Sequence, residues 1–434
     1  MLYEHANPAH IADDLLCWPP AEDLEPKHRN LPSPAALILL LAFMTLLNSF
    51  STDMLIPALP AISRDLGGSG WQVQQCLSLF FVACAFASLW YGAIADAWGR
   101  RPTLLVSLVL LGLAAAACAF TTGIEQLWGL RILQGLAAGA GLVLSRSILH
   151  DLYQGPDAQH RLSWITLIQT SSLLLTPSLG AWLCAHYGWR MVFVALAAIA
   201  LTLAAVYWRW LPETLPRDRR LGLNPAALGR AYLGVLRTPR FVRLSLAHVA
   251  NWVSMVIYAI SAPAIVVGLL GRKGTDIYLV YGPIALGLVA GFLLFPRLLY
   301  RWQASGTLAA AYLILSTSVA LNLALAWAWP AGMINLAPLF TYALGLAIAL
   351  PILVSGALEP LRQSAGVAAS CQTFLQLAMT AVAAGLLAPL LWDSMLSLAL
   401  GIGILTLAGG LALLLEGRAN RRPAPESIHC SETA

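Results

Sequence analysis

Long apolar runs alternate with short polar segments along nearly the whole chain. A helix of about 20 apolar residues crosses the roughly 30 Å hydrocarbon core of a bilayer. The short alternating segments of about ten residues that a transmembrane barrel needs do not occur in this sequence, so we expect every span to be a helix. The pattern predicts twelve spans, at 36–62, 72–95, 102–121, 126–149, 162–186, 190–211, 241–268, 276–299, 305–327, 332–357, 364–390 and 394–416.

Composition supports a membrane protein. Of the 434 residues, 59% are hydrophobic and 10% are charged, with a mean hydropathy of +0.75. These values lie far from those of a soluble domain. The first apolar run is too long for a secretory signal and continues past Pro57 to Pro60, so we expect an uncleaved first helix.

The longest gap between spans divides the chain into six spans and six spans. It is interrupted by prolines, and many secondary transporters have this 6 + 6 plan, with the substrate site between the halves. The predicted organisation is a tail at 1–35, a six-helix bundle at 36–211, a linker at 212–240, a second six-helix bundle at 241–416 and a tail at 417–434.

Loop charges set the expected orientation, because short loops rich in Lys and Arg stay in the cytoplasm. With both termini cytoplasmic, the opposite loops hold only Arg64, Arg190, Arg272 and Lys273. The net charge of +5 then follows from topology, and nucleic-acid binding is not needed to explain it.

Several function classes lack their motifs. The sequence has no G-x-x-x-x-G-K-[ST] loop, no H-E-x-x-H, no G-x-S-x-G and no large soluble domain, which argues against an ATP-driven pump, an intramembrane enzyme and a signalling sensor. The seven cysteines show no C-x-x-C pairing and are interpreted as packing residues. No cofactor or metal site is predicted.

Ionisable residues inside spans are costly and therefore mark candidate functional sites. Four stand out, at Asp53, Arg131, Arg146 and Glu359. Asp53 precedes Pro57, which loosens the helical hydrogen bonds, so this carboxyl group could exchange a proton as a cavity opens to either side. The alternative is a solvated structural residue near the outer mouth. Arg146 is interpreted as an anchor or gate partner at the cytoplasmic end.

The hairpin after the second span carries Gly92, Asp96, Gly99, Arg100 and Arg101. It resembles the loop of the major facilitator superfamily, whose pattern reads Gly-x-x-x-Asp-x-x-Gly-Arg-basic. The run Arg131-Ile132-Leu133-Gln134-Gly135 resembles the fourth-helix motif of the same superfamily.

Four strings narrow the resemblance to the bicyclomycin/chloramphenicol-resistance (Bcr/CflA) group of drug/proton antiporters. They are Ser51-Thr52-Asp53-Met54 with Pro57-Ala58-Leu59-Pro60, Arg131-Ile132-Leu133-Gln134, Leu211-Pro212-Glu213-Thr214-Leu215, and Ser364-Ala365-Gly366-Val367-Ala368-Ala369-Ser370 with Gln376. The resemblance implies an all-α membrane protein with the major facilitator fold, twelve transmembrane helices in two six-helix bundles.

The resemblance also implies roles for individual residues. Arg131 would hold down the pKa of a carboxylate in the amino-terminal half; a simple helix anchor is the alternative. The hairpin would close a cytoplasmic gate against the end of the eleventh helix, with Glu359 and Arg362 nearby. The alternative for the hairpin is a turn and topology signal, and Asp96 could also pair locally with Arg100, one helical turn away.

The fifth span retains Thr176-Pro177-Ser178-Leu179-Gly180, a remnant of the Gly-Pro-x-x-Gly-Gly signature of drug/proton antiporters. We expect helix bending at Pro57, Pro177 and Gly180. The loss of most of this signature keeps import open as an alternative to export.

Polar and aromatic residues of the spans are candidates for the substrate site. His248, Asn251, Trp252, Met255 and Tyr258 recur at three- and four-residue steps, which places them on one side of the seventh span. The predicted lining, suited to an amphipathic or aromatic solute, comprises Asn48, Gln134, Asn251, Trp252, Tyr258, Gln372 and Gln376.

The sequence thus predicts a monomeric, multi-pass exporter of the bacterial inner membrane that exchanges protons for a small organic solute, drug-like or a polar metabolite, by alternating access. Its partners would be the solute, protons and the lipid bilayer, with no nucleic acid. A dedicated exporter of siderophores or other metabolites, or a proton-coupled importer, remain alternatives.

Overall fold

The computed structural model describes residues 33–153, 155–220, 222–330 and 332–420, and within them it contains helices and no strand. The predicted tails at 1–35 and 417–434 lie mostly outside the described residues. The helices of the amino-terminal half are α2 (Pro34–Asp53), η3 (Ile56–Ala58), α3 (Leu59–Leu66), α4 (Gly70–Trp98), α5 (Arg100–Cys118), α6 (Ile124–Leu152), α7 (Gly155–Tyr187) and α8 (Arg190–Trp210).

The linker and the carboxyl-terminal half are also helical. The linker holds η4 (Arg217–Arg219) and α9 (Pro225–Leu236). The half that follows comprises α10 (Pro239–Ile260), η5 (Ala264–Leu269), η6 (Gly274–Ile277), α11 (Tyr278–Ala328), η7 (Met333–Leu336), α12 (Ala337–Leu358), η8 (Glu359–Ser364), α13 (Ala365–Val382), η9 (Ala383–Leu387), α14 (Ala388–Leu391) and α15 (Met395–Asn420).

The described residues contain ten helical segments that are long and apolar enough to cross a membrane. One of them, Gly274–Ala328, covers two predicted spans, because α11 consists of two helices that meet at a kink at Gln303. The fifth predicted span corresponds to α7, which is not among the ten. Each of the twelve predicted spans therefore falls on a helix, and the all-helical membrane prediction is confirmed.

Local sequence explains several helix ends. Ser69 and Gln72 form a reciprocal capping box at the start of α4, which satisfies two backbone groups that the helix leaves free. Gly99 has φ +110°, a conformation open to glycine, and this allows α5 to begin immediately after α4 ends. Small residues then bring the helices together: a Cβ at Gly135 would overlap the Phe80 carbonyl on α4.

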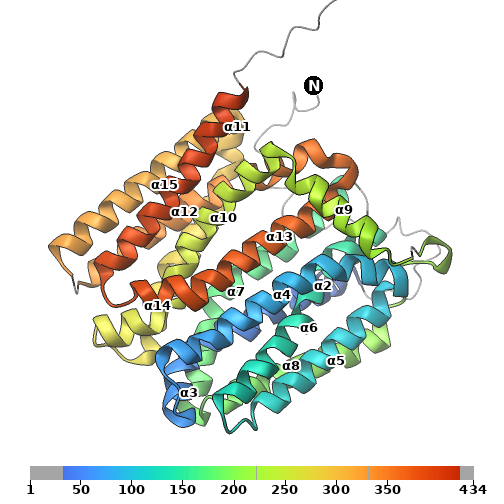
Figure 1. Cartoon of the computed structure of the whole chain (residues 1–434), viewed down its shortest axis with the longest axis horizontal. Helices are drawn as coiled ribbons and strands as arrows, with labels where there is room; N and C mark the ends of the chain where they lie inside the picture. Colours follow the sequence, from blue (N-terminus) through green and yellow to red (C-terminus); the bar gives the residue numbers. More distant parts are fainter. Residues whose placement is uncertain (1–32, 154, 221, 331, 421–434) are drawn as a thin grey trace, which may run out of the picture.

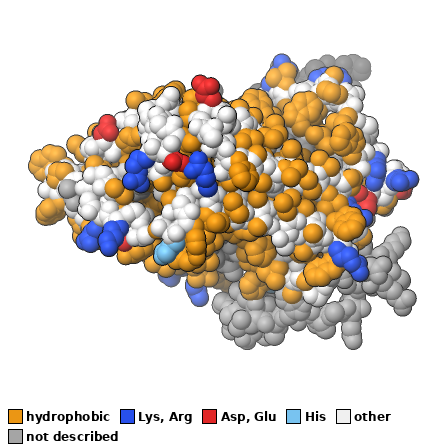
Figure 2. Space-filling view, turned by 90° about the horizontal axis from the view of Figure 1, so that it is seen from below, with side chains coloured by type: hydrophobic (Ala, Val, Ile, Leu, Met, Phe, Trp, Pro, Cys, Tyr) orange, Lys and Arg blue, Asp and Glu red, His pale blue; other side chains and the backbone are white. Residues whose placement is uncertain are grey.

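The helices form two groups that lie against each other (Figure 1). Helix α3 lies at one end of the molecule and α9 near the other, and we call these the α3 end and the α9 end. On the face shown in Figure 2, apolar side chains cover most of the surface, and charged ones gather toward its two ends. An apolar belt between charged ends is what a bilayer requires of a protein that spans it.

The two halves meet where α4 and α13 lie side by side, and we call this contact the seam (Figure 1). Gln75 on α4 donates to the Gly385 carbonyl at 3.0 Å, and Ser78 donates to the Ala381 carbonyl at 3.0 Å. Toward the α9 end, Tyr232 of the linker helix donates to the Leu89 carbonyl at 2.7 Å. The halves are thus connected by side-chain-to-backbone hydrogen bonds as well as by apolar packing.

Candidate functional site

Asp53 ends α2 at the point where the first span loses its regular helix. Its carboxylate accepts a hydrogen bond from the Thr52 hydroxyl at 3.1 Å, and no cation pairs with it among the described residues. It lies close enough to Tyr281 on α11 to interact with it electrostatically. The Tyr281 hydroxyl in turn donates to the Ala259 carbonyl at 2.9 Å. Asp53 therefore lies within electrostatic range of the carboxyl-terminal half.

The helix break beside Asp53 is packed tightly against α7. Pro57 lies in the 3-10 turn η3, and Pro177 lies inside α7, which stays helical through it. A Cβ at Gly180 would overlap the Met54 backbone, so this glycine permits the close approach of α7 to the break. The retained glycine of the antiporter signature thus supports the segment that carries Asp53.

Arg131 is completely buried, and its neighbours are not acids. Its Nε donates to the Cys76 carbonyl at 3.1 Å, one terminal nitrogen donates to Gln134 at 2.7 Å, and the guanidinium lies 4.3 Å from the centre of the Phe80 ring. Gln134, which accepts the hydrogen bond from Arg131, is also completely buried. The structure places both residues between the helices of the amino-terminal half, and the described residues include no carboxylate paired with Arg131.

Arg146 differs from Arg131. More than a third of its surface is accessible. No hydrogen-bond or ion-pair partner for it occurs in the described part of the chain. The role of Arg146 as an anchor or gate partner at the cytoplasmic end stays a prediction.

The predicted lining residues of α10 separate into two groups. Asn251 donates to the Tyr312 hydroxyl at 2.6 Å and Tyr258 donates to Asn322 at 3.0 Å, and both are fully buried inside the carboxyl-terminal half. His248 lies 3.3 Å from the Gln376 side-chain oxygen, which joins α10 to α13. Trp252 is half-buried against the central core.

Two further predicted residues carry buried polar atoms without a partner. They are the Asn48 side-chain oxygen on α2 and the Gln372 side-chain nitrogen on α13, one from each half. Buried polar groups normally have partners. These atoms are therefore available to a solute or to water.

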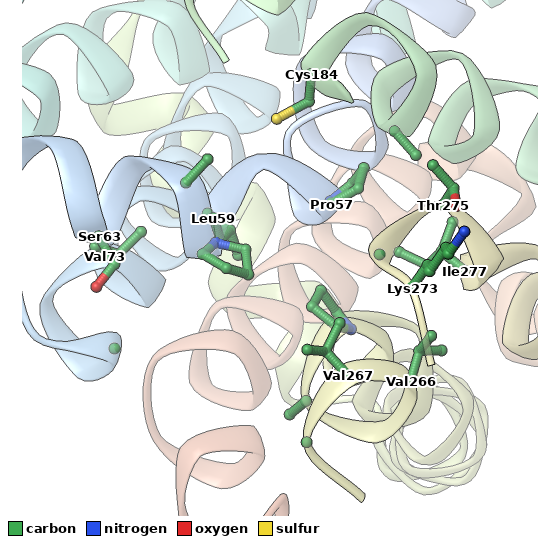
Figure 3. Close-up of a pocket in the computed structure, with 18 of the residues that line it drawn as sticks. Pro57, Leu59, Ser63, Val73, Cys184, Val266, Val267, Lys273, Thr275 and Ile277 are labelled. Atoms are coloured by element: carbon green, nitrogen blue, oxygen red, sulfur yellow. The ribbon is translucent and has the colours of Figure 1, made fainter. Parts of the chain in front are cut away.

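A cavity of about 940 Å³ opens between the halves at the α3 end (Figure 3). Its walls come from α3, the start of α4, the end of α7 and the π-helical segment η5. Pro57 and Ile277 line it. Asp53 lies one helical turn before Pro57 in the sequence, and Tyr281 lies one helical turn after Ile277. The Asp53 region is thus next to the cavity.

The hairpin forms an ionic cluster at the α9 end. Arg100 pairs with Asp96 at 2.6 Å and with Asp151 of α6 at 3.1 Å, and its backbone N–H donates to the Glu213 carboxylate at 2.9 Å. The expected local pairing of Asp96 with Arg100 is present. The Arg101 side chain donates to the Trp208 carbonyl.

The other expected gate residues lie elsewhere. Glu359 pairs with Arg240 of α10 at 2.6 Å rather than with the hairpin. The Arg362 side chain lies outside what the structure describes. A Cβ at Gly92 would meet no atom within 4 Å, so this glycine is not needed for close packing here.

Sequence reasoning missed several residues that the structure places at these sites. Glu213 and Asp151 hold the hairpin, and Arg64, Lys273 and Gln74 line the cavity. A signal for two of them was present, because Arg64 and Lys273 are among the few cations of the predicted outer loops.

Comparison with known proteins agrees with this architecture. Residues 41–384 match the Major Facilitator Superfamily. The chain is 28% identical to the chloramphenicol resistance protein of Pseudomonas aeruginosa, over 77% of this chain and 79% of the relative. It is 30% identical to a bicyclomycin resistance protein homolog of Haemophilus influenzae, over 45% of this chain and 49% of the relative.

Solved structures show the same fold at low identity. The human organic anion transporter MFSD10 matches with a TM-score of 0.65 and 19% identity, over 88% of this chain and 98% of that one. The nucleoside transporter NupG matches with a TM-score of 0.67 and 14% identity, over 87% and 99%. The predicted resemblance is confirmed, and the chain belongs to the Major Facilitator Superfamily, a family of transporters.

Proposed function

We propose that this protein is a proton-coupled exporter of a small organic solute in the bacterial inner membrane, with both termini in the cytoplasm. The two halves would rock about the seam so that a site between them faces each side in turn. On this topology the α3 end faces outward and the α9 end faces the cytoplasm.

The position of Asp53 carries the proposal. It is an acidic residue in the first span, it lacks a cation among the described residues, and it lies one helical turn from Pro57, which lines the cavity, and within electrostatic range of Tyr281 in the other half. Such a carboxyl group can accept a proton from one side and release it to the other as the halves move. The names of the relatives, which are resistance proteins, favour drug-like solutes and export.

The membrane potential makes this coupling useful. Each elementary charge that crosses is worth about 2.3 kcal/mol per 100 mV. Since about 1.4 kcal/mol corresponds to a factor of ten, one proton at that potential supports a solute gradient of roughly 50-fold.

The ionic cluster at the α9 end supports a cytoplasmic gate. It ties α4 and α5 to α6 and to the start of the linker, through Asp96, Arg100, Asp151 and Glu213. The same end holds the pair between Glu359 and Arg240 in the other half. We propose that these two clusters keep the cytoplasmic ends of the bundles rigid while the halves rock.

Replacing Asp53 tests the proposal. In inverted membrane vesicles with an imposed pH gradient and chloramphenicol as the probe, Asp53→Asn should lower proton-driven accumulation at least tenfold at equal expression. Asp65→Asn is the matched control, because Asp65 already pairs with Arg190 and does not line the cavity. Unchanged accumulation by Asp53→Asn would overturn the assignment.

The direction and the natural solute need a second measurement. Small molecules are compared in the medium of cells that carry or lack the gene. An exporter enriches its solute in the medium of cells that carry the gene, and a dedicated exporter of a siderophore enriches an iron chelator. Depletion of a medium component would indicate import instead.

A further inference from the structure

The cavity at the α3 end has an unusual charge composition for a space inside an apolar protein. Its only charged lining residues are Arg64 and Lys273, both exposed, and no Asp or Glu lines it. The other walls are mostly apolar and include Val73, Val266 and Trp392. Figure 3 shows Lys273 beside Ile277 at the edge of the cavity.

Nearby acids do not neutralise these two cations. Asp65 follows Arg64 directly, but it pairs with Arg190 and accepts from the Trp189 ring nitrogen. Asp276 lies three residues beyond Lys273, and no ion pair joins the two. Arg64 uses its Nε on the Pro60 carbonyl at 3.3 Å, and this leaves its terminal nitrogens without an acidic partner among the described residues.

A third group points to the same ligand chemistry. Gln74 of α4 lines the cavity and is 3% exposed, and its side-chain nitrogen has no acceptor in the structure. A buried donor without an acceptor costs about 1–3 kcal/mol. Two unpaired cations and one unpaired donor therefore surround an apolar space of about 940 Å³.

From this arrangement we propose that the cavity binds the carboxylate or another anionic group of an amphipathic organic solute. The inference rests on the proposed export function, since it assigns the cavity to a solute on its way out. Cations in a cleft with apolar walls attract anions more strongly than they do on an open surface. The apolar walls then cover the body of the solute.

The two cations come from different halves, so an anion bound to both would affect how the halves move. Arg64 belongs to α3 and Lys273 lies in the loop between η5 and η6. An anion held by both joins the halves at the α3 end. Departure of the anion removes this link and leaves two like charges on the walls of one cavity, which favours opening on this side.

Equilibrium binding of a matched pair of probes tests the inference. The full-length protein in nanodiscs of zwitterionic lipid is titrated with 2-naphthylacetate and with 2-naphthylacetamide, which share their shape but differ in charge. We expect the carboxylate to bind at least tenfold more tightly than the amide. Lys273→Gln and Arg64→Gln should each remove most of this difference.

Arg272→Gln supplies the control. Arg272 neighbours Lys273 but does not line the cavity, and it donates to the Met333 sulfur instead. This variant should keep the preference for the carboxylate. Equal binding of acid and amide to the unmodified protein, or the same loss in Arg272→Gln, would overturn the proposal.

Two further measurements are needed. One distinguishes a solute from a lipid headgroup as the bound anion, and the other distinguishes failure of the anion site from failure of the proposed export function. In nanodiscs of anionic lipid, retained binding of 2-naphthylacetate supports a solute site, whereas its loss by competition assigns the cations to lipid headgroups and overturns the inference. Asp53→Asn should retain the preference for the carboxylate. If the preference is absent while Asp53→Asn still abolishes efflux, the anion site fails and the exporter stands.

Discussion

At the α9 end, each half has a turn between two long helices, and the two turns are built differently. In the amino-terminal half, Gly99 makes the turn with φ +110°, and the Asp96, Arg100, Asp151 cluster surrounds it. In the carboxyl-terminal half, α11 passes the equivalent position with one distorted residue, Gln303, at φ +55°. The first turn is surrounded by ion pairs, whereas the second is a one-residue break between two helices.

The carboxyl-terminal half places its ion pairs on other helices. Glu416 at the end of α15 is 6% exposed and pairs with Arg243 at 2.7 Å, while Arg240 pairs with Glu359. Arg297 and Arg301, which flank the second turn, form no ion pair in the described part of the chain. Arg240, which joins Glu359 to Glu416, lies on α10 and away from the second turn, whereas Arg100, which joins Asp96 to Asp151, is a shared cation within the first turn itself.

The largest expected effect comes from that shared cation. Arg100→Gln breaks two ion pairs, and hydrogen bonds to charged groups are worth about 1.5–3 kcal/mol. We expect proton-driven efflux to fall roughly tenfold or more in vesicles. Arg301→Gln is the matched change in the other half and should leave efflux within about twofold of the parent; equal losses would remove the distinction between the two turns.

A smaller effect is expected from the carboxyl-terminal cluster. Glu416→Gln removes the negative charge that pairs with Arg243 at a mostly buried position, so thermal unfolding in detergent should show a loss of about 2 kcal/mol. Transport per folded molecule should remain. A loss of transport without a loss of stability would show that this cluster also takes part in gating.

The smallest effects concern the backbone of the two turns. Gly99→Ala forces a side chain into φ +110° and against Glu213, and Gln303→Gly relieves a residue at φ +55°. Such strain is worth about 1–3 kcal/mol. We expect opposite shifts of the unfolding midpoint, downward for Gly99→Ala and upward for Gln303→Gly. Shifts of the same sign would contradict this account of the turns.

The sequence was sufficient for the features that depend on local pattern. Apolar runs long enough to cross a bilayer predicted the helices, and Gly99 between two such runs predicted the first turn. The local pair of Asp96 with Arg100 followed from their spacing of four residues. Each of these properties is determined within a few residues of the chain.

The features that depend on packing between distant segments could not be predicted. Regular spacing placed Asn251 and Tyr258 on one side of α10, but it could not say that this side faces Tyr312 and Asn322 rather than the gap between the halves. Likewise, Arg64 and Lys273 are 209 positions apart, and only the fold brings them to one cavity.

The seam between α4 and α13 gives a measure of how readily the halves can separate. Its hydrogen bonds run from Gln75 and Ser78 to backbone carbonyls of the partner helix, and the net worth of such a bond is about 1 kcal/mol. Breaking both therefore costs about 2 kcal/mol. On the proposed coupling, the roughly 2.3 kcal/mol released when one charge crosses 100 mV would be of the same order as the cost of breaking the polar part of the seam.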